Sequence, residues 1–195
     1  MSARRLVGAL AVGVAVAVLA AGCGSSSSNN SSQTGAAPGA TGTTSPIVQY
    51  HLNPAAPSAS SQMICNAEGQ NAIAGSLGLK PLKTPKGVWA NDTYTCVYAY
   101  KTGTMTLSVH ELPSDAAAMT YFNQLGQKLG RLPADTVLGQ GTFRIRDDSM
   151  FVVKDNKVMD VDVTKLPASF GVPPLDRADV ALTIAVTIMG CWTGA

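Results

Sequence analysis

The chain has 195 residues, with 14 Lys or Arg against 12 Asp or Glu, so its net charge is +2 when both histidines are neutral. Arg4 and Arg5 account for this excess, because no other charged residue precedes Glu68. The length fits one domain with a tail, and the balanced charge argues against a nucleic-acid partner, since phosphate contacts need a basic excess.

Residues 1–22 have the order of a secretory signal peptide. Arg4 and Arg5 form a positive start, residues 6–21 are uncharged and apolar, and small residues lead to Cys23. The apolar run is shorter than the roughly 20 residues that a membrane-spanning helix needs. The signal peptide is therefore expected to be removed from the mature protein.

The sequence Leu-Ala-Ala-Gly-Cys at residues 19–23 resembles the lipobox of bacterial lipoproteins. This resemblance implies cleavage before Cys23, transfer of a diacylglycerol to the Cys23 thiol, and acylation by chains such as palmitate. Two or three acyl chains anchor a protein stably. We therefore expect an exported protein whose lipid holds it to the outer face of the cytoplasmic membrane.

The segment that follows, with the lipidated Cys23 at its start, predicts a disordered tether over residues 23–60. It consists mainly of Ser, Asn, Thr, Gly, Ala and Pro and contains no Asp, Glu, Lys or Arg. Such a segment cannot bury enough apolar surface to offset its chain entropy. As a coil it would reach about 30–36 Å. Residues 47–52 are more apolar, and they form either an added edge strand or docking peptide, or simply more of the linker.

Residues 61–195 predict a single globular domain that opens with a helix at about 65–79, which Gly78 and Pro81 end. A loop carrying Trp89 follows, and then two strands at 94–101 and 104–112, joined at Thr102-Gly103. This pairing sets Tyr100 opposite Met105, Tyr98 opposite Leu107 and Cys96 opposite Val109, all on one apolar face. The opposite face carries smaller and more polar side chains: Thr95, Val97, Ala99, Thr106, Ser108 and His110.

Ser114 predicts the start of a second helix, which Gly130 ends. Three strands are expected near 143–146, 150–154 and 158–163. A three-residue turn at 155–157 would keep Phe151 and Val153 on the same face as Met159, Val161 and Val163, and would leave Asp160 and Asp162 outward.

Asp176 predicts the start of a last helix that runs to about residue 191. The element order is then α-β-β-α-β-β-β-α. It predicts an α+β fold in which helices pack on an antiparallel sheet.

Several motifs in this order resemble those of small exported lipoproteins of actinobacteria, many of unknown function. They are Met63-Ile64-Cys65, Tyr94-Thr95-Cys96-Val97-Tyr98, Leu107-Ser108-Val109, Val153-Lys154-Asp155 and Gly190-Cys191-Trp192-Thr193-Gly194. Some relatives of this layout look like the PsbP/Mog1 fold. The resemblance implies a cell-envelope protein without assigned catalytic residues. It also implies a disulfide between Cys65 and Cys96, while Cys65–Cys191 is the alternative because chain ends often lie close together.

Few residues suggest a catalytic or metal-binding role. His110 and Glu111 are adjacent in a strand and point to opposite faces, so they do not form an acid–base pair. A hydrolase is the least expected function, because no G-x-S-x-G motif is present. Asp147-Asp148 and Asp160/Asp162 do not match a calcium loop, so no metal and no cofactor is expected.

Four aromatic side chains either line an apolar ligand pocket or simply belong to the core: Trp89, Tyr94, Tyr98 and Tyr100. The sequence therefore favours a non-enzymatic binding or interaction module with an envelope protein or apolar ligand as partner. The alternative is a carrier of a lipid or another apolar envelope ligand.

Overall fold

The computed structural model describes residues 49–192, so the signal peptide, Cys23 and most of the expected tether lie outside the described residues. The helices are α1 (Ala59–Gln62), α2 (Ala67–Leu77), α3 (Asp115–Leu129) and α4 (Arg177–Cys191). The strands are β1 (Gly87–Ala90), β2 (Thr93–Tyr100), β3 (Gly103–Glu111), β4 (Gly141–Arg144), β5 (Met150–Lys154), β6 (Lys157–Asp162), β7 (Ser169–Phe170) and β8 (Leu175–Asp176).

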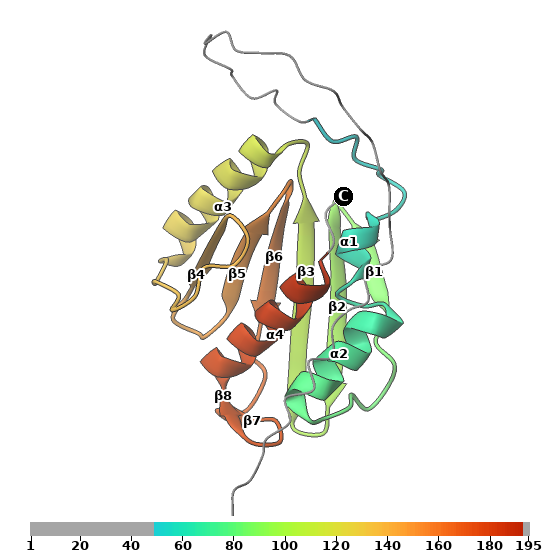
Figure 1. Ribbon diagram of the computed structural model, residues 1–195, viewed down its shortest axis with the longest axis vertical. Coiled ribbons are helices and arrows are strands. Elements are labelled where there is room, and N and C mark those ends of the chain that lie inside the picture. Colours follow the sequence, from blue (N-terminus) through green and yellow to red (C-terminus); the bar gives the residue numbers. More distant parts are fainter. Residues whose placement is uncertain (1–48, 193–195) are drawn as a thin grey trace, which may run out of the picture. The chain divides into compact units, whose positions relative to one another are not determined.

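Six strands form one antiparallel sheet in the order β1-β2-β3-β6-β5-β4, and β7 pairs with β8 in a small hairpin. Figure 1 shows α4 crossing the sheet, with α2 beside it and α3 along the β4–β5 side. The α+β class with helices packed on an antiparallel sheet is therefore confirmed. β1, β7 and β8 were not predicted, because each is short and lies in a stretch rich in turn residues.

The sheet has a hydrophobic core on each face. Met150 and Val152 of β5 pack with α2 and α4 in the larger core, whereas Phe151 and Val153 pack with α3 in the smaller core. Successive strand residues point to opposite faces, so α3 and α4 lie on opposite sides of β5. This double cover explains why β5 is an almost continuous apolar run.

The predicted three-residue turn after β5 was wrong. Lys154 pairs with Lys157, so the turn has two residues, Asp155 and Asn156, rather than three. Phe151 lies directly opposite Asp160. The three-residue prediction assumed that all apolar residues of β5 and β6 share one face, and α3 makes that assumption wrong.

The β2–β3 register also differs from the predicted one, by two residues. Tyr100 pairs with Gly103 and Tyr98 with Met105, so the turn is Lys101-Thr102. The faces remain as predicted, because a shift of two preserves side-chain alternation. Gly103 begins β3, and a side chain there would bring its first carbon to 2.2 Å from the carbonyl oxygen of Lys165, so the position requires glycine.

The first predicted helix begins later than expected and is preceded by a separate turn, α1. The Asn66 side chain accepts a hydrogen bond from the Gly69 amide at 2.8 Å and so begins α2. Gly78, at a φ of 61°, ends it. The predicted starts of α3 at Ser114 and α4 at Asp176 are confirmed, although the Asp176 side chain makes no capping hydrogen bond.

Residues 49–62, here named the N-terminal strap, contact the folded domain although most of them were predicted as tether. Gln49 forms an isolated antiparallel bridge with Ser114. The indole nitrogen of Trp89 donates to the Pro54 carbonyl at 3.0 Å. Trp89 therefore holds the strap against β1.

Glu111 fastens the other end of the strap. Its buried carboxylate accepts hydrogen bonds from the Ser58 amide at 2.8 Å and from the Ser61 hydroxyl at 2.5 Å. Lys157 lies opposite Glu111 in β6 and is also buried. Burial lowers the pKa of Lys157, and the charge of Glu111 opposes that shift. The strap thus covers a polar cluster at the end of β3 and β6.

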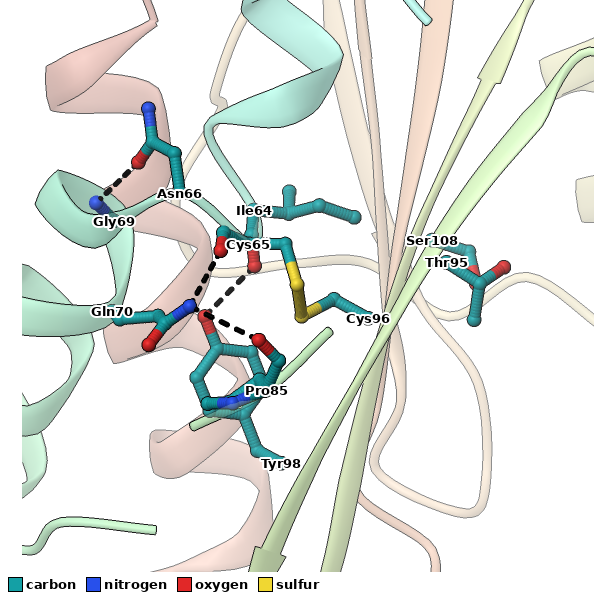
Figure 2. Close-up of a disulfide and its surroundings, with 10 residues drawn as sticks. All are labelled: Ile64, Cys65, Asn66, Gly69, Gln70, Pro85, Thr95, Cys96, Tyr98 and Ser108. Atoms are coloured by element: carbon teal, nitrogen blue, oxygen red, sulfur yellow. Dashed lines mark hydrogen bonds between the residues drawn. A yellow bond between two sulfur atoms is a disulfide. The ribbon is translucent and has the colours of Figure 1, made fainter. Parts of the chain in front are cut away.

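Cys65 and Cys96 lie at disulfide distance, with 2.10 Å between their sulfur atoms (Figure 2). Beside them, the Tyr98 hydroxyl donates to the Ile64 carbonyl at 2.8 Å, and the Gln70 side-chain amide donates to the Cys65 carbonyl at 2.6 Å. These contacts attach the start of α2 to β2. The alternative pairing of Cys65 with Cys191 is not the one seen, and Cys191 is buried at the end of α4.

Candidate functional site

The aromatic residues considered as pocket lining occupy other roles. Tyr98 is fully buried, and the Tyr100 ring packs edge-on against Phe170 with 4.9 Å between ring centroids. Tyr94 packs against the larger core, and Trp89 holds the strap. None of the four lines the pocket described below, which lies on the opposite face of the sheet.

α3 covers only part of its face of the sheet, because it packs on β5 and β6. The neighbouring side chains of β2 and β3 on this face are not buried, and Val97 is 49% exposed. We name this surface the open half-face, and its residues are Thr93, Thr95, Val97, Thr106, Ser108 and His110. The predicted polar face of the hairpin is therefore a surface without a covering helix among the described residues.

A pocket of about 200 Å³ lies where α3 meets the open half-face. We name it the His110 pocket, and its lining residues are Thr93, Ser108, His110, Tyr121, Leu125, Leu129, Phe151, Val158 and Asp160. Polar groups come from the strands, whereas α3 supplies Tyr121 and the two leucines. The pocket thus combines an apolar wall with a polar floor, which is typical of small-molecule sites.

The polar floor is held by contacts between strands. Nδ1 of His110 lies 2.9 Å from the Thr93 hydroxyl, and the Ser108 hydroxyl lies 3.3 Å from that of Thr95. The Tyr121 ring packs on the His110 ring with 4.8 Å between centroids. These contacts fix the imidazole before any ligand arrives.

Asp160 is the exceptional group of the pocket. Its side chain is half-buried, and its buried Oδ1 has no hydrogen-bond partner. Burial, followed by the charges of Asp162 and Asp147, raises the pKa of Asp160 to about 7. A carboxyl without a partner in such surroundings marks a candidate functional site.

His110, Ser108 and Asp160 are not joined to one another by hydrogen bonds. His110 lies opposite Val158, whereas Asp160 lies opposite Ser108, and no hydrogen bond joins His110 to Asp160. The Ser108 hydroxyl contacts Thr95 rather than the imidazole. The hydroxyl within hydrogen-bond reach of the imidazole is that of Thr93, but no carboxylate among the described residues hydrogen-bonds the ring, so the third group that orients a catalytic base is missing there.

The remaining acidic candidates do not converge. Asp148 accepts from the Arg177 guanidinium at 3.2 Å, and Asp162 accepts from the Thr164 amide and hydroxyl at 2.9 and 2.6 Å. Within residues 49–192, no three His, Cys, Asp or Glu side chains are grouped to hold a metal ion. No helix in the same range has the length and apolar character needed to span a membrane.

Sequence reasoning named His110, Ser108 and Asp160 but did not bring them together. The sequence did contain a signal: the alternation in β3 and β6 places all three side chains on the same face of the sheet. Tyr121 was missed altogether, because its proximity depends on how α3 lies on the sheet. Comparison of the chain with protein-family models, with curated proteins and with solved structures gives no match.

Proposed function

We propose that this protein is a cell-envelope lipoprotein that acts as a non-enzymatic binding module. In this proposal a diacylglycerol on Cys23 holds it to the outer face of the cytoplasmic membrane, and the His110 pocket takes the ligand. The lipobox supports the anchor. The observation that carries the binding function is the unpartnered carboxyl of Asp160 inside the pocket.

A buried carboxyl without a partner costs folding free energy, so its presence at a pocket favours a functional explanation. Elsewhere, buried polar side chains are mostly satisfied, as Glu111 is by the strap. Among the described residues, the strap contacts residues that do not line the pocket, such as Trp89, Glu111 and Ser114.

A lipid carrier is less well supported. The pocket's volume of about 200 Å³ corresponds to about seven water molecules in the liquid. That volume suits a small group rather than a whole acyl chain. A hydrolase is supported least, because the His110 ring, which lies beside the Thr93 hydroxyl, has no hydrogen bond to a carboxylate among the described residues.

The proposal is tested by native mass spectrometry of the full chain extracted from its host membrane with a neutral detergent. We expect a polypeptide that begins at Cys23 and carries a diacylglycerol, together with a non-covalently bound molecule. The variant Ser108→Leu fills the pocket and should lose that molecule. The control Thr106→Leu changes the same strand and face outside the pocket lining and should retain it.

Two results would contradict the proposal separately. A mature chain that begins elsewhere than Cys23 contradicts the lipid anchor. A bound molecule that Ser108→Leu retains as well as the control, or no bound molecule in any preparation, contradicts the pocket as the binding site.

A further inference from the structure

The charge of the His110 pocket is one-sided. Among the described residues that line it, Asp160 is the only acid, and there is neither Lys nor Arg. Asp162 lies two residues away on the same face, and its charge and that of Asp147 act on Asp160. Together these groups give the pocket a negative field that a cation would relieve.

Asp160 differs from Glu111, Asp115, Asp148 and Asp155 in having no compensating group among the described residues. Glu111 accepts two hydrogen bonds from the strap, and Asp148 pairs with Arg177. Asp115 and Asp155 also have a buried oxygen without a partner, but both interact with the charge of Lys157. Of the acids compared, Asp160 is the one that has no Lys or Arg partner among the described residues, and a bound ligand can supply the positive charge.

The walls around this carboxyl are apolar and aromatic. Phe151 lies directly opposite Asp160 in β5, and Tyr121 faces the pocket from α3. An ammonium group is attracted by the faces of aromatic rings, and its apolar substituents gain from contact with aliphatic side chains such as Leu125. A neutral polyol would use the hydroxyls of the floor but would leave the negative field uncompensated.

We propose that the His110 pocket binds a small organic cation, a protonated or quaternary amine on a compact apolar body, with Asp160 as its counter-charge. This inference rests on the proposed binding function and names its ligand class. The ammonium approaches the carboxyl group of Asp160 from the pocket, and the apolar body packs between Tyr121, Phe151 and Leu125. The volume of about 200 Å³ restricts the body to a ring or a short chain.

Binding then depends on pH. The groups that face or act on Asp160 are His110 of β3, Tyr121 of α3, Asp162 of β6 and Asp147 of the preceding loop. Because the cation binds the ionised carboxyl, and the pKa of Asp160 is about 7, affinity rises about tenfold between pH 6 and pH 8. The variant His110→Asn removes the imidazole and should retain this rise.

The experiment uses benzylamine as the cationic probe and benzyl alcohol as its neutral counterpart, titrated into the full chain in dodecyl maltoside and followed by calorimetry. At pH 8, benzylamine should bind at least tenfold more tightly than benzyl alcohol. Asp160→Asn should weaken benzylamine binding roughly ten- to hundredfold and leave benzyl alcohol unaffected. The control Asp162→Asn removes one negative charge from the same strand. It should lower the affinity for benzylamine less than threefold, and added salt should abolish this effect.

Equal binding of the two probes, or an Asp160→Asn variant that binds benzylamine like the wild type, overturns the cation assignment while the pocket remains a binding site. Binding of neither probe also overturns it. The loss or retention of the co-purified molecule in Ser108→Leu still decides the binding function by itself. Circular dichroism of each variant verifies that it is folded, so a lost affinity is not a lost fold.

Discussion

Replacing Asp160 by Asn should stabilise the protein at neutral and alkaline pH. Asn has nearly the same shape and cannot ionise, so it removes the buried charge without leaving a cavity. In the wild-type protein the pKa of Asp160 rises from its ordinary value of 3.8 to about 7, chiefly through burial. The unfolded chain therefore releases the Asp160 proton at a lower pH than the folded protein does.

The size of the effect follows from this difference. The contribution of Asp160 to stability is fully present below pH 3.8 and is lost as the pH rises through about 7. A shift of about three pKa units corresponds to about 4 kcal/mol of unfolding free energy. Part of the carboxyl still touches water, which weakens the effect. We therefore expect Asp160→Asn to raise the free energy of unfolding by about 2–4 kcal/mol at pH 8 and to leave it almost unchanged at pH 4.

Urea unfolding followed by the fluorescence of Trp89 and Trp192 measures this gain at both pH values. The matched variant Asp162→Asn removes a carboxylate that accepts two hydrogen bonds from Thr164, and it should not stabilise. The reasoning would be refuted by a gain of equal size at pH 4 and pH 8, or by an Asp160→Asn variant less stable than the wild type at pH 8.

Two further predictions use the same unfolding assay, and a third uses amide exchange. Replacing Cys65 and Cys96 together by Ala should cost about 3–4 kcal/mol, since the bridge closes a separation of 31 residues; a cost below 1 kcal/mol would contradict a structural role. Tyr98→Phe should cost about 1–3 kcal/mol by leaving a buried carbonyl unpaired, whereas Tyr100→Phe should be neutral or stabilising, because its hydroxyl has no partner; equal costs would refute this contrast. Glu111→Ala should release the strap, seen as faster amide exchange across it, and unchanged exchange would show that the Glu111 hydrogen bonds do not hold it.

The sequence predicted the elements whose signals are local. Ser114 and Gly130 bound a helix in any context, because the cap hydrogen bond and the left-handed turn are made within a few residues. Alternation placed Tyr98 and Met105 on the buried face even though the predicted register was two residues off. The predicted faces are correct because a shift of two residues leaves every side chain on the same face of the sheet.

The candidate site could not be predicted as a whole. The predicted turn kept Phe151 away from Asp160, because one buried face was assumed for the sheet. Nothing local in β5 or β6 shows that α3 and α4 cover opposite sides. The packing of α3 and α4 buries β5 on both of its faces. It also brings Tyr121 of α3 to the pocket.

The sequence by itself determined the α+β class, the faces of the hairpin and the expectation of a lipid-anchored envelope protein, since each rests on a pattern read along the chain. The tertiary structure decided where the helices lie, how the strap contacts Trp89 and Glu111, and that Asp160 is buried without a partner beside His110. The physical reason is that burial and partnering are properties of space. A carboxyl's pKa and its capacity to hold a cation depend on which groups the fold brings within a few ångströms of it.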